Sequence, residues 1–102
     1  MEYNKLVRDM IPQIIKERGK HPKTHIAEEN EFLKKLKEKL REEADEFSES
    51  EDIEELADIL EVINAIIAAK GTSPQKLEEI RQQKAKERGG FEKRIILESI
   101  ED

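Results

Sequence analysis

Cysteine and tryptophan are absent from this sequence, and only 4% of its residues are aromatic. Without cysteine, the chain has neither disulfides nor thiol chemistry. No apolar run approaches the roughly 20 residues that cross a bilayer, and the chain opens with no signal-peptide pattern. We therefore expect a cytoplasmic protein that has no membrane partner.

Negative charge exceeds positive charge, because the chain has 19 Lys and Arg against 25 Asp and Glu, for a net charge of −6. This balance argues against nonspecific binding to nucleic acid. Only 35% of the 102 residues are hydrophobic, whereas 43% are charged. We expect a single domain over residues 1–102 with a modest core, built from helices that each bury one face and hide more apolar surface by oligomerising.

Apolar periodicity and helix-end signals predict an all-α fold, an antiparallel bundle of about four helices. After an extended arm over residues 1–8, the first helix begins at an Asp9 cap, carries Pro12 in its first turn and ends before Gly19. The other three helices are expected at about 28–47, 51–70 and 74–87. The helix at 51–70 should be the most buried, and the helix at 74–87 should be capped by Ser73. A short C-terminal strand within 91–100, paired near residue 24, is a further expectation.

Acidic residues are concentrated in the second and third predicted helices, and some of them fall at positions that should face the core. Residues 42–61 contain eleven acids and no Lys or Arg. The first of these helices has an apolar face whose missing member falls at Glu43, and Glu46 lies three residues later on nearly the same side. That face consists of Leu33, Leu36, Leu40 and Phe47. Carboxylates on a core-facing stripe are costly unless a positive group lies between them.

The third helix repeats the pattern. Its stripe of Ile59, Val62 and Ile66 reaches Glu55 when it is traced back one turn, and Asp58 follows three residues later. Glu42 and the remaining acids of this region are expected to face solvent or lie in the turn.

A helical hairpin pairs residues that are equidistant from its turn. Glu43 pairs with Asp58, and Glu46 with Glu55, about the same midpoint between residues 50 and 51, inside a turn expected at 48–52. The four carboxylates would form a square with rungs about 4.5 Å apart. Acids this close do not all stay ionised without cations, and oxygen-only ligands suit Mg²⁺ or Mn²⁺.

Basic segments flank the acidic hairpin on both sides, an arrangement that suits a polyphosphate. Lys5, Arg8, Lys93 and Arg94 are the candidate phosphate contacts, with ordinary surface ion pairing as the alternative. Glu61 and Asn64 follow Asp58 by one and two turns, and either supports the metal ligands, contacts substrate or lies on an exposed face. Tyr3 and Phe91 are aromatic candidates for stacking on a base, although core packing is the expectation for Phe91.

The spacing Glu43-x-x-Glu46 followed by Glu55-x-x-Asp58 resembles the metal-binding signature of the all-α nucleoside triphosphate pyrophosphohydrolases. These include MazG-like proteins, dimeric dUTPases and phosphoribosyl-ATP pyrophosphohydrolase. The segments YNKLVRD at 3–9 and ERGGFEKR at 87–94 resemble a small phosphoribosyl-ATP pyrophosphohydrolase-like, MazG-related subfamily. The resemblance thus covers nearly the whole chain.

The resemblance implies that the four acids bind Mg²⁺ and that water cleaves a nucleotide between its α and β phosphates, giving a monophosphate and pyrophosphate. It also implies a homodimer or homotetramer and, by analogy, a house-cleaning role on non-canonical nucleotides. Metal-bound water would be the nucleophile, with Glu43 or Glu46 as the candidate general base. Only eight residues separate Glu46 from Glu55, a shorter gap than in many members, which leaves the substrate open. The alternative is a non-enzymatic helical module that oligomerises or senses nucleotides.

Overall fold

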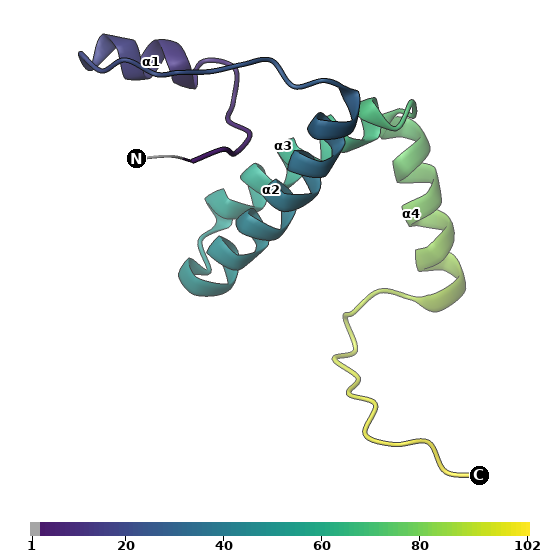
Figure 1. The fold of residues 1–102 in the computed structure, drawn as a ribbon. Coiled ribbons are helices and arrows are strands. Elements are labelled where there is room, and N and C mark those ends of the chain that lie inside the picture. Colours follow the sequence, from purple (N-terminus) through teal and green to yellow (C-terminus); the bar gives the residue numbers. More distant parts are fainter. Residues whose placement is uncertain (1–2) are drawn as a thin grey trace. The chain divides into compact units, whose positions relative to one another are not determined.

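The computed structural model describes residues 3–102 and contains four helices in that part of the chain (Figure 1). They are α1 (Ile11–Glu17), α2 (Glu29–Ser50), α3 (Ile53–Ala69) and α4 (Pro74–Arg88). Within residues 3–102 there is no β-strand, so the all-α prediction is confirmed and the expected strand at 91–100 does not form. The apolar residues of that segment meet no partner strand, and Ile95 and Ile96 are about four-fifths exposed, at 79% and 80%.

The chain divides into two compact units, Met1–Gly71 and Thr72–Asp102. The first unit holds α1, α2 and α3, and the second holds α4 and the C-terminal segment. No described helix is long and apolar enough to cross a membrane. The prediction that residues 1–102 act as one domain stays a prediction.

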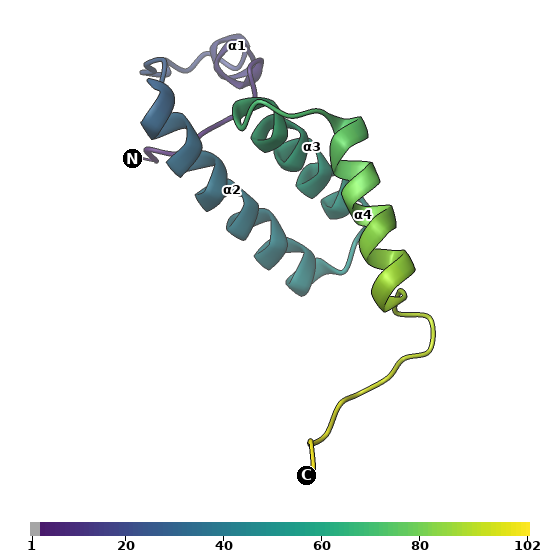
Figure 2. The ribbon, with the colours of Figure 1, turned by 90° about the vertical axis from the view of Figure 1, so that its right-hand side faces the viewer.

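The first unit is organised around an antiparallel hairpin of α2 and α3, which lie side by side in both views (Figures 1 and 2). Helix α2 runs to Ser50, three residues beyond the predicted end, and α3 begins at Ile53. Glu51 closes α2 in the left-handed conformation, with φ of 58°, and its backbone N–H donates to the Phe47 carbonyl oxygen. Asp52 is extended and begins α3. Two residues therefore reverse the chain, which fixes the register between the helices.

The buried apolar core is small and lies between these two helices. Leu36 of α2 and Val62 and Ile67 of α3 are the buried hydrophobic side chains of the described chain. Another face of α3 is exposed: Ile53 is 76% exposed and Leu60 is 58% exposed. Two of the three buried apolar side chains of the described residues lie on α3, which agrees with the prediction that this helix is the most buried, while another part of α3 is exposed.

Side-chain caps begin α2 and α4, and the cap of α4 at Ser73 is the predicted one. The Glu28 carboxylate accepts from the Glu31 backbone N–H at 2.7 Å, and the Ser73 hydroxyl accepts from the Lys76 N–H at 3.1 Å. The predicted Asp9 cap is wrong, because Met10 is the cap residue of α1 and makes no side-chain cap bond.

Large apolar side chains are exposed on both units. Leu56 and Leu60 of α3 are 40% and 58% exposed, and Leu77 and Ile80 of α4 are 38% and 45% exposed. Phe91 is 97% exposed, so the expectation that it packs in a core is wrong for this chain. It lies in the irregular segment after α4, where no described element covers it. Exposed apolar surface of this kind is typical of an interface with a partner.

Candidate functional site

Acidic side chains of α2 and α3 converge in the first unit. Carboxylate oxygens of Glu43, Glu55 and Asp58 all lie within 4.8 Å of one another, and so do those of Glu42, Glu43 and Glu46. Glu43 belongs to both groups and is only 7% exposed. We call these five residues the acidic cluster.

The hairpin explains why residues from two helices meet here. Because the turn is so short, Glu43, seven residues before the end of α2, faces the first two turns of α3, where Glu55 and Asp58 lie. Glu43 takes the position that an apolar residue of the α2 stripe would occupy, and the helix packing buries it. Three of the four carboxylates predicted to form a square, those of Glu43, Glu55 and Asp58, thus belong to one group. Glu46 belongs to the second group, which shares Glu43 with the first.

The charges of the acidic cluster act on one another. Burial raises the pKa of the Glu43 carboxyl, and its contact with Glu46 raises that pKa further, while Lys39 acts in the opposite direction. Partial burial also raises the pKa of Glu55, with the charges of Asp58 and Glu43 adding to the effect. Ionising the whole cluster is therefore unfavourable without added positive charge.

Basic side chains supply part of that charge. The Arg8 guanidinium lies 2.7 Å from an Asp58 oxygen, and the Lys5 ammonium lies 3.0 Å from a Glu42 oxygen. Lys39 lies 3.3 Å from Glu43 and 3.5 Å from Glu42. The N-terminal arm therefore reaches the acidic cluster, with Lys5 and Arg8 on carboxylates.

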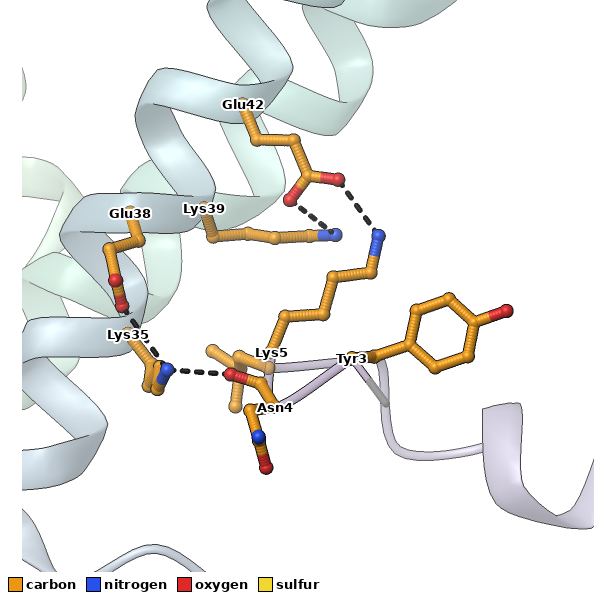
Figure 3. A pocket seen from close by; sticks show the side chains of 8 residues that line it. Tyr3, Asn4, Lys5, Lys35, Glu38, Lys39 and Glu42 are labelled. Carbon is orange, nitrogen blue, oxygen red and sulfur yellow. Dashed lines mark hydrogen bonds and ion pairs between the residues drawn. The ribbon is translucent and has the colours of Figure 1, made fainter. Parts of the chain in front are cut away.

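A cavity of about 290 Å³ adjoins the acidic cluster where the N-terminal arm meets α2 (Figure 3). Its walls carry three ammonium groups, from Lys5, Lys35 and Lys39, and two carboxylates, from Glu38 and Glu42. Tyr3, Asn4 and Leu6 complete the lining. Glu42 therefore belongs both to the acidic cluster and to the wall of the cavity.

Three residues of the cavity wall were not predicted from the sequence as site residues. Glu42 was expected to face solvent, yet its side chain is 32% exposed and pairs with two lysines. Lys35 and Lys39 were not considered, although Lys39 precedes Glu43 by one helical turn, a spacing that pairs side chains on one face. That spacing is the signal that would have found Lys39.

The remaining candidates are not in the acidic cluster. Glu61 and Asn64 are exposed on α3, and neither joins the groups of clustered acids found in the described chain. Lys93 and Arg94 are exposed in the second unit. The substrate contacts expected of these four residues stay predictions.

The donor set of the acidic cluster consists only of carboxylate oxygens. Such hard ligands fit Mg²⁺ or Mn²⁺ better than they fit softer transition metals. A divalent cation shared by Glu43, Glu55 and Asp58 would relieve the repulsion that raises the pKa of Glu43 and Glu55. No family model, curated protein or solved structure matches this sequence.

Proposed function

We propose that the protein is a Mg²⁺-dependent nucleotide pyrophosphohydrolase, which converts a nucleoside triphosphate and water into a monophosphate and pyrophosphate. The observation that supports this most is the convergence of Glu43, Glu55 and Asp58 within 4.8 Å around a carboxylate that is 7% exposed. The Glu-x-x-Glu and Glu-x-x-Asp motifs of the all-α pyrophosphohydrolases fall on these positions. Mn²⁺ would serve the same ligands.

Each acid has a role that follows from its place. Glu43, Glu55 and Asp58 hold the cation between α2 and α3, and Glu46 borders the same site through Glu43. Bound Mg²⁺ neutralises phosphate charge and lowers the pKa of a coordinated water. Glu46 is exposed and is the better placed of the two candidate bases to take the water proton and release it to solvent, whereas Glu43 is buried.

The basic residues of the N-terminal arm take up the charge of the phosphates. Arg8 forms an ion pair with Asp58, and Lys5 forms one with Glu42. Both side chains are therefore close enough to contact phosphate oxygens bound beside the acidic cluster. The Arg8 fork matches phosphate oxygens. Lys93, Arg94, Glu61 and Asn64 remain the further predicted substrate contacts.

Exposed apolar residues on α3 support self-association as a homodimer or homotetramer. Leu56 and Leu60 lie one turn apart on one face of α3 and are 40% and 58% exposed. A second copy that covered this face would remove apolar surface from water.

The test is pyrophosphate release from a panel of ordinary and modified nucleoside triphosphates, with Mg²⁺, with Mn²⁺ and with a chelator. We expect metal-dependent turnover of at least one substrate and its loss in Glu43→Gln. Glu49→Gln is the matched control, because Glu49 is exposed on the same helix and lies outside the acidic cluster. No turnover across the panel, or equal rates in the two variants, would refute the proposal.

The second candidate is a non-enzymatic module that senses nucleotides or assembles with partners. The ion pairs of Arg8, Lys5 and Lys39 favour it, since they already offset part of the acidic charge without metal. A purely structural module would show no rise of its melting midpoint with Mg²⁺, because only a ligand bound by the folded state raises that midpoint. A sensor would show the rise with nucleotide but form no product.

A further inference from the structure

The cavity beside the acidic cluster combines ammonium groups from two elements of the first unit. Lys35 and Lys39 lie one turn apart on α2, and Lys5 enters from the N-terminal arm (Figure 3). The Lys35 ammonium donates to the Asn4 carbonyl oxygen at 2.6 Å, which fastens the arm to α2. The three positive groups therefore share one small space.

Each ammonium group also pairs with a carboxylate, and another anion is able to replace that carboxylate. Lys5 and Lys39 share Glu42, at 3.0 and 3.5 Å, and Lys35 lies 3.5 Å from Glu38. The pairing raises the pKa of Lys5 and lowers the pKa of Glu42, so both are charged at neutral pH. Ion pairs this exposed to water contribute little to stability, typically about 1 kcal/mol or less. Replacing one of their carboxylates by another anion therefore costs little.

We propose that this cavity is an anion subsite that binds a phosphate group through Lys5, Lys35 and Lys39. Its volume of about 290 Å³ admits a phosphate with its hydration water. Lysine is a common phosphate ligand and acts there as a point charge. The phosphate comes either from a free inorganic anion or from the phosphate chain of a nucleotide, which share the same chemistry.

The subsite is coupled to the acidic cluster through shared residues. A divalent cation held by Glu43, Glu55 and Asp58 competes with Lys39 for the Glu43 carboxylate, which lies 3.3 Å from the Lys39 ammonium. The released Lys39 ammonium group then turns to the phosphate. By linkage, the cation strengthens phosphate binding and phosphate strengthens cation binding by the same factor. This coupling rests on the proposed function, because it requires the metal site.

The experiment measures binding of inorganic phosphate, pyrophosphate and a nucleoside monophosphate to the full chain by calorimetry, with and without Mg²⁺. We expect inorganic phosphate to bind and Mg²⁺ to tighten its binding several-fold. Because pyrophosphate chelates Mg²⁺ in solution, the coupling is read from inorganic phosphate. Tighter binding of the monophosphate than of inorganic phosphate identifies a nucleotide as the source, and equal binding identifies the free anion.

Lys35→Gln and Lys39→Gln should each weaken phosphate binding roughly tenfold, the loss expected for one charged hydrogen bond. Lys37→Gln is the matched control, because Lys37 is exposed on the same helix and does not line the cavity. Circular dichroism checks that each variant folds, and Lys5→Gln replaces any variant that does not.

Equal phosphate binding in Lys35→Gln, Lys39→Gln and Lys37→Gln would overturn the subsite, as would a lack of phosphate binding in both metal conditions. Phosphate affinity that is unchanged by Mg²⁺ would overturn the coupling. The subsite and the proposed function fail separately. Phosphate binding that depends on Lys35, without turnover of any triphosphate, refutes the enzyme and keeps the subsite. Turnover of a triphosphate, together with equal phosphate affinity in Lys35→Gln and the parent, keeps the enzyme and refutes the subsite.

Discussion

Replacing Glu43 by glutamine should stabilise the metal-free protein and abolish most of its stabilisation by Mg²⁺. The Glu43 carboxylate is 7% exposed and lies within 4.8 Å of the carboxylates of Glu55 and Asp58. Its burial and its acidic neighbours raise its pKa, so the charged form is disfavoured in the folded state. Glutamine keeps the shape of the side chain and removes the charge.

The size of the effect follows from what is lost and what is relieved. Glutamine removes a charge that burial and the neighbouring carboxylate of Glu46 disfavour in the folded state, and the expected gain is about 1 kcal/mol, the typical size of a single-substitution effect. The gain is limited because Lys39, 3.3 Å from Glu43, loses one of its partners. About 1 kcal/mol corresponds to a rise of roughly 4–8 °C in the melting midpoint of a domain of about 100 residues.

Mg²⁺ should reverse the order of the two proteins. At a concentration one hundred times the dissociation constant, a ligand that binds only the folded state stabilises by about 2.7 kcal/mol. The parent protein should gain this amount and Glu43→Gln little of it, because the variant lacks the carboxylate common to both acidic groups. The variant should thus melt above the parent in chelator and below it in Mg²⁺.

Thermal melting by circular dichroism, with a Mg²⁺ titration, checks both halves of the prediction. Glu49→Gln makes the same chemical change on an exposed part of α2 and should follow the parent in both conditions. The reasoning is refuted if Glu43→Gln melts below the parent in chelator, or if Mg²⁺ raises the two midpoints equally.

Three further predictions concern the arm, the pH dependence and the exposed face of α3. Arg8→Gln should change the metal-free stability by less than about 1 kcal/mol, because its pair with Asp58 is half exposed. The same variant should raise Mg²⁺ affinity, measured by calorimetry, since the guanidinium no longer competes with the cation; a weaker affinity would contradict this. In urea unfolding without metal, stability should rise as the pH falls from neutral through the raised pKa of Glu43 towards its unfolded value near 4.3, because the folded state binds that proton more tightly. The rise should be smaller in Glu43→Gln, and an equal rise in both proteins would assign it to other groups. Leu60→Lys places a charge on an α3 position that is 58% exposed and should shift the protein towards monomer in analytical ultracentrifugation, while its free energy of unfolding falls by no more than about 0.5 kcal/mol. An unchanged mass would place the interface elsewhere.

Much of the fold was predictable because its signals are local. The Ser73 cap with Pro74 after it marked the start of α4, and apolar periodicity located α2 and α3 to within a few residues. The convergence of Glu43 with Asp58 was predictable too, because a short turn and the rise of a helix fix which residues oppose each other.

The surroundings of the acidic cluster were decided by contacts distant in sequence. Arg8 and Asp58 are 50 positions apart, and Lys5 and Glu42 are 37 apart. Both pairs depend on the path of an arm without regular structure, which no periodicity describes. The predictions of a cap at Asp9 and of a buried Phe91 were wrong. Both followed from local preference and hydrophobicity, whereas capping and burial also depend on the neighbours that surround a residue in the folded chain.

By itself, then, the sequence determined the four helices and the register that brings acids of two helices together, since both follow from spacing along a continuous chain. Only the tertiary structure decided which cations meet those acids and that a lysine-lined cavity adjoins them. Those facts depend on where a non-helical segment returns to the hairpin, and that position is set by pairwise contacts between side chains far apart in the sequence.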